Sequence, residues 1–209
     1  KTLIESANTQ GKRVYVLLNG ALLDEDIKLL PAFLDDIQSL APHALVISDL
    51  GVLRLAKKHT SIPLHISTQA SVTNPHAALF WKAEGASRIV FARELSIEAC
   101  ATIQTKANIL GEMFVAGAMC SSYSGKCTIS NYTSGRDSNR GGCVQSCRHP
   151  YQLESDKKTA TPPVHLINAK DLWGVRLIPE IIRYGIHSLK IEGRMKSNLY
   201  VANTVSVYR

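Results

Sequence analysis

Four of the five cysteines fall within one short stretch in the middle of the chain, and their thiolates are typical ligands of soft metals. They are Cys120, Cys127, Cys143 and Cys147. Thiolates suit zinc, Cu(I) and iron–sulfur clusters. Six, fifteen and three residues separate successive cysteines, a spacing that matches neither the bacterial ferredoxin run nor the paired zinc-ribbon pattern. We expect an iron–sulfur cluster first and a structural zinc second, while disulfides and free thiols stay open.

Polar and charged residues follow several apolar runs, so they would meet at one rim if these runs are parallel strands. The segment from Lys190 to Lys196 places three cations and Glu192 after one such run. Arg194 suits a carboxylate or phosphate because a guanidinium group binds two oxygens at once. A lone histidine such as His65 is more often structural than functional. The remaining candidates for a shared substrate site are His65, Thr68, Gln69, Arg93 and Lys190.

Short β-branched runs alternate with amphipathic stretches along the chain, which predicts parallel strands joined by helices. The expected strands are 13–19, 44–49, 64–67, 88–92, 112–116, 164–167 and 188–191, and the expected helices include 1–8, 24–40, 74–84 and 96–106. The first helix would follow one further strand. The order therefore predicts a (β/α)8 barrel that lacks its first strand, with an open doubly wound sheet as the alternative.

Residues 117–162 interrupt this rhythm after the fifth visible strand, which would be the sixth strand of a complete barrel. This long segment carries all four clustered cysteines. A connection of such length in a compact domain is usually functional or disordered, and the cysteines favour a function. We treat residues 1–209 as a single partial barrel domain that contains this Cys-rich insertion.

The composition is that of a soluble globular domain, with 45% hydrophobic and 20% charged residues among 209. No apolar run is long enough for a membrane helix, and the first residues do not read as a signal peptide. The chain begins without Met, so we expect a fragment of a longer cytoplasmic protein. The net charge of +7 and the pI near 9.2 are compatible with an RNA partner.

Residue patterns give little support to peptidase chemistry. The sequence contains neither the His-Glu-x-x-His motif of zinc peptidases nor the Gly-x-Ser-x-Gly motif of serine hydrolases. A cysteine nucleophile paired with a histidine stays formally possible, but it would compete with metal binding for the same thiolates. Cys100 lies in a helix-like run and is expected to be a small buried hydrophobe.

Several short motifs occur in an order that spans nearly the whole chain. They lie at 65–69, 92–95, 112–120, 123–127, 136–141, 143–148, 168–172 and 189–196, and include Tyr-Ser-Gly-Lys-Cys and Cys-Val-Gln-Ser-Cys-Arg. On these motifs the chain resembles the collagenase-like peptidase family, peptidase family U thirty-two. The resemblance implies a barrel-like domain whose first strand and helix are absent.

Better-understood members of this family look like iron–sulfur proteins that hydroxylate RNA bases or ubiquinone precursors without molecular oxygen. The resemblance implies Cys120, Cys127 and Cys143 as the firmest cluster ligands. Cys147 is then the fourth, because Trp173 stands near the position where some members have a later cysteine. Many members carry a histidine where this chain has Ala116, which weakens any mechanism that needs an imidazole there.

The resulting hypothesis is an iron–sulfur enzyme that hydroxylates a base of tRNA or rRNA, and we expect a cluster of four irons and four sulfides, with zinc as the alternative. Prephenate is implicated as the oxygen source in relatives, so Arg194 or Lys190 would hold the carboxylate of a small acid. Glu94 or Glu192 would move protons. The alternatives are a collagenase-like peptidase, and a non-catalytic partner in a heteromer with a second family member.

Overall fold

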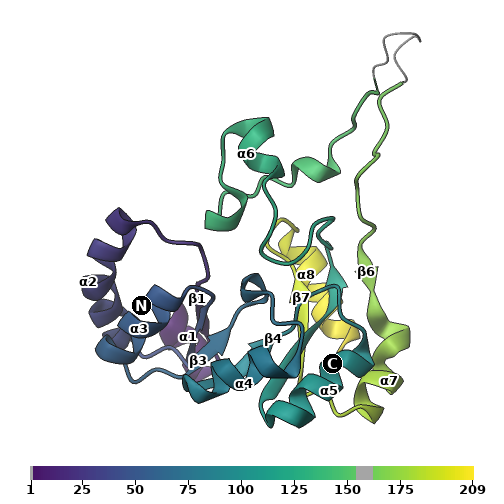
Figure 1. Cartoon of the computed structure of the whole chain (residues 1–209). Coiled ribbons are helices and arrows are strands. Elements are labelled where there is room, and N and C mark those ends of the chain that lie inside the picture. Colours follow the sequence, from purple (N-terminus) through teal and green to yellow (C-terminus); the bar gives the residue numbers. More distant parts are fainter. Residues whose placement is uncertain (1, 154–161) are drawn as a thin grey trace.

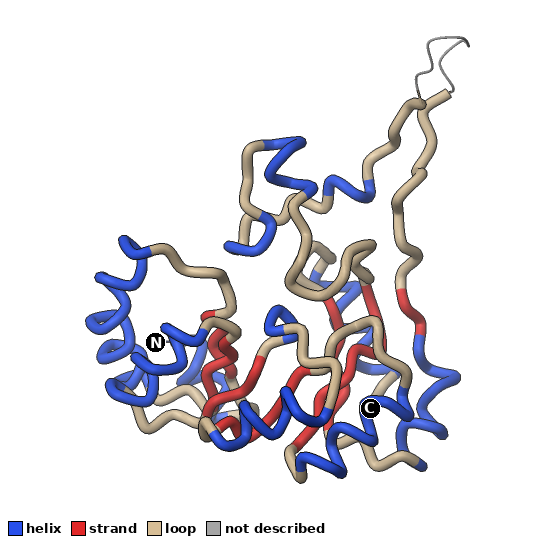
Figure 2. Tube along the Cα trace, in the orientation of Figure 1, coloured by secondary structure: helices blue, strands red, loops and turns tan. Residues whose placement is uncertain are grey.

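A curved parallel sheet is the framework of the molecule. The computed structural model describes residues 2–153 and 162–209. Six strands lie side by side and parallel in the order β1 (Tyr15–Leu18), β2 (Ala44–Ile47), β3 (Leu64–Ile66), β4 (Ala86–Val90), β5 (Leu110–Gly117) and β7 (Ser188–Glu192). The two-residue strand β6 (Leu172–Trp173) pairs with β5 in the antiparallel direction. The sheet curls into a half-barrel (Figure 2).

Helices connect the parallel strands. They are α1 (Thr2–Thr9), α2 (Asp24–Leu40), α3 (Leu50–His59), α4 (Pro75–Ala83), α5 (Ile97–Ala107), α6 (Ile129–Ser134), α7 (Ile178–Arg183) and α8 (Asn198–Val207). Helices α3, α4, α5 and α7 follow the outer side of the sheet, while α6 lies apart from them, above the ends of the strands (Figure 1). No helix in the described ranges is long and apolar enough to cross a membrane.

Side-chain caps explain where several of these helices begin. Asp49 Oδ1 accepts hydrogen bonds from the backbone N–H groups of Gly51 (2.7 Å) and Val52 (3.1 Å) at the start of α3. Asn74 and Ser96 accept in the same way at the start of α4 and α5. Such caps satisfy N–H groups that have no partner inside the helix. Helix α3 therefore begins directly beyond the carboxyl end of β2, and α4 and α5 begin after the turns that follow β3 and β4.

The two faces of the strands differ in chemistry, as the alternation of side chains along a strand requires. Leu45, Leu64, Ile66 and Ile89 belong to the main hydrophobic core, which includes buried residues of α2 to α5. Residues of opposite parity, including His65, Arg88 and Glu112, are also buried but lie outside that core. The concave side of the half-barrel therefore carries buried charged groups.

Six of the seven expected strands are present with shifts of a few residues, and the expected helices are present as α1, α2, α4 and α5. The expected strand at 164–167 is wrong. Val164 forms only an isolated antiparallel bridge with Tyr151. Val164, Leu166 and Ile167 are 42–46% exposed, so this run has no core to pack against. In the part of the chain that is described, β1 and β7 do not pair, and the sheet is not a closed barrel.

The segment between β5 and β6 holds all four clustered cysteines. Apart from α6, its described part contains two short 3₁₀ turns, Ser138–Arg140 and Ser146–Arg148. Arg140 attaches it to the loop after β1 by donating to the Ala21 carbonyl (2.8 Å), and to α2 by pairing with Asp26 (2.9 Å). The segment is thereby held over the carboxyl ends of the strands. The residues between 153 and 162 lie outside the described ranges.

Candidate functional site

A cavity of about 230 Å³ opens at the carboxyl ends of the parallel strands. Residues that follow β1, β3 and β4 form one side of it, with residues of β5 and β7, and the Cys-rich segment forms the other. In half-barrels as in complete barrels, this end gathers the loops that carry chemistry. The site-candidate residues predicted from the sequence that border the cavity are Thr68, Gln69, Arg93, Cys120, Cys127, Cys143, Cys147, Lys190, Glu192 and Arg194.

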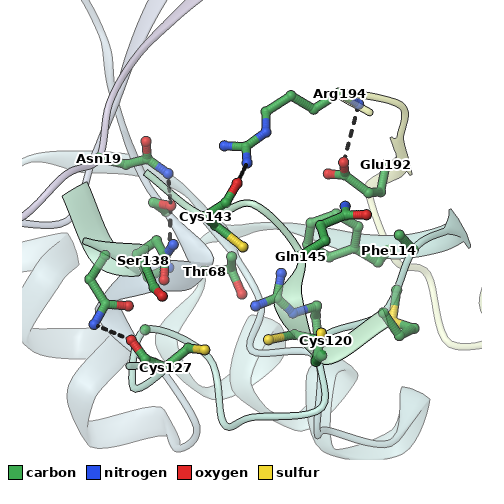
Figure 3. A pocket seen from close by; sticks show the side chains of 18 of the residues that line it. Asn19, Thr68, Phe114, Cys120, Cys127, Ser138, Cys143, Gln145, Glu192 and Arg194 are labelled. Atoms are coloured by element: carbon green, nitrogen blue, oxygen red, sulfur yellow. Dashed lines mark hydrogen bonds between the residues drawn. The ribbon is translucent and has the colours of Figure 1, made fainter. Parts of the chain in front are cut away.

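All four clustered cysteines are free thiols that border this one cavity. The sulfur atoms of Cys120, Cys127 and Cys143 face the same space (Figure 3). Burial raises the pKa of the Cys120 thiol above its usual value, and Cys127 and Cys147 add smaller effects in the same direction. Within the described residues, no three His, Cys, Asp or Glu side chains are grouped tightly enough to hold one metal ion as they stand.

A buried serine fixes the loop between the first two cysteines. Ser124 is fully buried, and its hydroxyl donates to Glu94 (2.9 Å) and accepts from the Arg93 N–H (3.1 Å) and from Thr68 (3.2 Å). The next residue, Gly125, has a φ of +73°, and an added Cβ would overlap the Gln69 carbonyl oxygen. The loop is therefore docked on the turns that follow β3 and β4.

Two arginines attach the second pair of cysteines to the rest of the fold. Arg194 donates to the carbonyl oxygen of Cys143 (2.8 Å). Arg148 pairs with Asp171 (2.8 Å), which also pairs with Lys196 (2.6 Å). The hydrogen bond from Lys196 and the neighbouring Arg148 hold the pKa of Asp171 below its usual value. These contacts link the second pair of cysteines to the β7–α8 connection.

Two cations flank one aromatic ring inside the cavity. The Arg93 guanidinium lies 5.6 Å from the centre of the Phe114 ring, and the Lys190 ammonium lies 5.5 Å from it. All three residues border the cavity. The Nε atom of Arg93 is buried and has no hydrogen-bond partner among the described residues. A buried donor without a partner is costly, so this group is suited to receive an anionic oxygen from a ligand.

Lys190 contacts a buried cluster of charged residues that is centred on Glu112. The Glu112 carboxylate accepts from Arg88 (3.3 Å), Lys190 (3.2 Å) and Ser188 (3.2 Å). Arg88 and Glu112 have side chains that are 7% and 10% exposed. His65 belongs to the same region, because Arg88, Glu112 and Lys190 all act on its ionisation. Glu112 therefore joins residues of β4, β5 and β7 and holds the Lys190 ammonium group in place.

His65 should give the protein a measurable pH dependence. Burial, with a smaller effect of Arg88, lowers its pKa from 6.5 to about 4. Below pH 6.5 the His65 imidazole therefore becomes protonated in the unfolded chain, whereas in the folded protein it stays neutral until the pH falls to about 4. The contribution to stability is complete above pH 6.5 and is lost as the pH falls towards 4, by up to about 3 kcal/mol.

The His65→Gln variant lacks this titration, so its unfolding free energy should fall less than that of the unchanged protein over the same pH window. Urea unfolding at several pH values measures both slopes. If the unfolding free energy of both proteins changes equally with pH, His65 is not the group responsible for the pH dependence.

Two predicted site residues lie away from the cavity. His65 is buried on β3, in edge-to-face contact with Tyr15 at 4.9 Å. Glu94 does not border the cavity and accepts hydrogen bonds from Ser124. Arg194 borders it, but one of its nitrogens donates a hydrogen bond to the Cys143 carbonyl.

The fifth cysteine, Cys100, is fully buried in α5, as expected, and burial raises its pKa to about 12.

Sequence reasoning missed the residues that hold the site together. Arg88 and Glu112 were read only as strand residues, although a charge inside a buried strand is itself a signal of a partner on a neighbouring strand. Ser124 gave no signal, because serine is common in loops. Arg148 gave no signal of its role either, because its pairing with Asp171 is a contact between residues distant in sequence.

Comparison with known proteins gives consistent relatives along the whole chain. The chain is 39% identical over 214 residues to the "tRNA hydroxylation protein P1" of Bacillus subtilis and 35% identical over 208 residues to the "23S rRNA 5-hydroxycytidine C2501 synthase" of Escherichia coli. It is 30% identical over 221 residues to a "Collagenase" of Porphyromonas gingivalis. Each match covers 99% of this chain, but 51%, 32% and 53% of the three relatives.

The chain thus spans from one third to about half the length of these relatives. Their names describe RNA hydroxylation in two cases and proteolysis in the third. The family model described as "Peptidase family U32" matches residues 1–209. The chain therefore belongs to peptidase family U32.

Proposed function

We propose that this chain belongs to an iron–sulfur enzyme that hydroxylates a base of tRNA or rRNA without molecular oxygen. The observation that carries the proposal is the set of four free thiols around one cavity at the carboxyl ends of the strands. Two relatives bear names of RNA hydroxylation. A protein that acts on these RNAs works where they are, so we place it in the cytoplasm.

The four thiols are a donor set of the kind that holds an iron–sulfur cluster. Cys120, Cys127, Cys143 and Cys147 would hold it, and the bound cluster would supply electron transfer and a coordination position to the substrates.

The cations of the cavity would orient a small acid that provides the oxygen atom, such as prephenate. Arg93, whose buried Nε has no hydrogen-bond partner among the described residues, is better placed for its carboxylate than Arg194, which already donates to the Cys143 carbonyl. Lys190 adds a second positive charge beside the Phe114 ring. Glu192 borders the cavity, where its carboxylate accepts from the Arg194 N–H at 3.1 Å. It is the carboxylate in position to take up a proton.

A peptidase is the second candidate, because one relative is named a collagenase. The cavity offers little for that chemistry. None of the described residues that border it is a histidine, so a cysteine there has no imidazole base beside it.

Nucleoside analysis tests the proposal. Total tRNA and rRNA from cells that lack the gene should lose one hydroxylated nucleoside in mass spectrometry, and the intact gene should restore it. An unchanged nucleoside profile would contradict RNA hydroxylation and favour a peptidase or a non-catalytic partner in a heteromer.

A further inference from the structure

A tyrosine at the edge of the cavity has no role in the site as described so far. Tyr123 borders the cavity, yet it is 72% exposed. In the described structure its hydroxyl makes no hydrogen bond, and its ring has no contact with another ring or a cation. Exposed tyrosines are common on protein surfaces, so exposure alone decides nothing. Its position beside the cavity is what requires an explanation.

The backbone that carries Tyr123 is firmly held. Lys126 N donates to the Tyr123 carbonyl oxygen (3.1 Å) and closes a turn. Inside this turn Ser124 is fully buried and bonds to Thr68, Arg93 and Glu94 of two other segments. Gly125 packs directly on the Gln69 backbone. Ser124 is therefore anchored in the interior, while the side chain of its neighbour Tyr123 is exposed to solvent. The ring is mobile only about its own side-chain bonds, which reduces the entropy lost when a ligand stacks on it.

The surroundings of the ring are cationic. Lys126, in the same turn, is exposed and forms no ion pair within the described ranges. Arg93 and Lys190 lie inside the cavity that Tyr123 borders. An aromatic face beside cations is what proteins use to bind single-stranded nucleic acid, because bases stack on the ring and phosphates approach the cations.

We infer that Tyr123 stacks on an unpaired RNA base at the mouth of the cavity and thereby guides it towards the thiol-lined interior. This inference rests on the proposed function, which it deepens by naming the residue that receives the base. It requires an accessible ring and no contribution of the tyrosine hydroxyl. A phenylalanine at the same position should therefore serve nearly as well.

The chain offers a matched control. Tyr132 lies on α6 in the same Cys-rich segment and is 88% exposed, but it does not border the cavity. The three variants are Tyr123→Ala, Tyr123→Phe and Tyr132→Ala, each made in the full-length protein. Fluorescence anisotropy with a labelled oligouridine of about 12 nucleotides measures RNA binding. Nucleoside mass spectrometry of cells complemented with each variant measures the reaction, and thermal unfolding shows whether the fold is kept.

Tyr123→Ala should weaken oligouridine binding roughly 5- to 100-fold, as loss of one base–aromatic stack does, and should reduce the hydroxylated nucleoside. Tyr123→Phe should restore most of both, and Tyr132→Ala should leave both unchanged. If Tyr123→Ala keeps normal binding and modification, or if Tyr132→Ala weakens binding equally, the inference is wrong while the proposed function stands. If the unchanged protein neither binds the RNA nor restores the nucleoside, both fail together.

Discussion

The Cys127→Ala variant is expected to lose its iron and sulfide and, with them, all detectable hydroxylated nucleoside in complemented cells. Cys127 borders the cavity shared by the other three clustered thiols. Because a cluster with four cysteine ligands depends on each of them, removing one opens the site to solvent and oxidation. Its loop is anchored by Ser124 and by the hydrogen bond from Asn139 to the Cys127 carbonyl (2.9 Å). The substitution should therefore leave the backbone in place.

Cys100→Ala provides the matched control, since Cys100 lies in the core of α5 and away from the cavity. This variant should keep its iron and its activity, with a modest loss of stability from the smaller side chain. Iron and acid-labile sulfide are measured after anaerobic purification. If Cys127→Ala keeps the full iron and sulfide content, the assignment of Cys127 as a ligand fails.

Replacing Glu112 by glutamine is expected to lower the unfolding free energy by about 3–5 kcal/mol, because it leaves two cations without their counter-charge. Arg88 and Lys190 both donate to the Glu112 carboxylate, and the Arg88 and Glu112 side chains are almost fully buried. Arg88 already has one buried nitrogen without a partner among the described residues. The variant should also displace Lys190 and weaken any ligand that depends on its charge.

A surface pair provides the comparison for this variant. Glu84 pairs with Lys57 at 3.1 Å, and their side chains are 40% and 47% exposed. Glu84→Gln should therefore cost no more than about 1 kcal/mol. Urea unfolding of both variants at neutral pH gives the two values. Equal losses would mean that the inner cluster adds nothing beyond an ordinary surface ion pair.

The framework was largely predictable because β2, β3 and β4 are short, mostly buried runs, and the helices α3, α4 and α5 that follow them begin at side-chain caps. Prediction failed at 164–167, where apolar residues suggest a strand but the side chains remain 42–46% exposed. Strand β6 (Leu172–Trp173) was missed because two residues give no periodic signal. Whether six parallel strands close into a barrel depends on curvature, which the local pattern does not encode.

Site residues could be predicted from the sequence only where the residue type itself indicates a chemical role, such as metal binding or charge. The four cysteines, Lys190 and Glu192 stood out by type and position, and the structure brings them to one cavity. The roles of Ser124, Arg88 and Glu112 depend on contacts between separate strands and loops, so they needed the register of the sheet. Arg194 was expected at the substrate, and the structure shows it bonded to the Cys143 carbonyl.

The most direct test of the account is the metal content of the full-length protein purified without oxygen. The account predicts iron and acid-labile sulfide in roughly equal amounts, about four of each per chain, and an absorption band that reductant bleaches. Stoichiometric zinc without sulfide would contradict it.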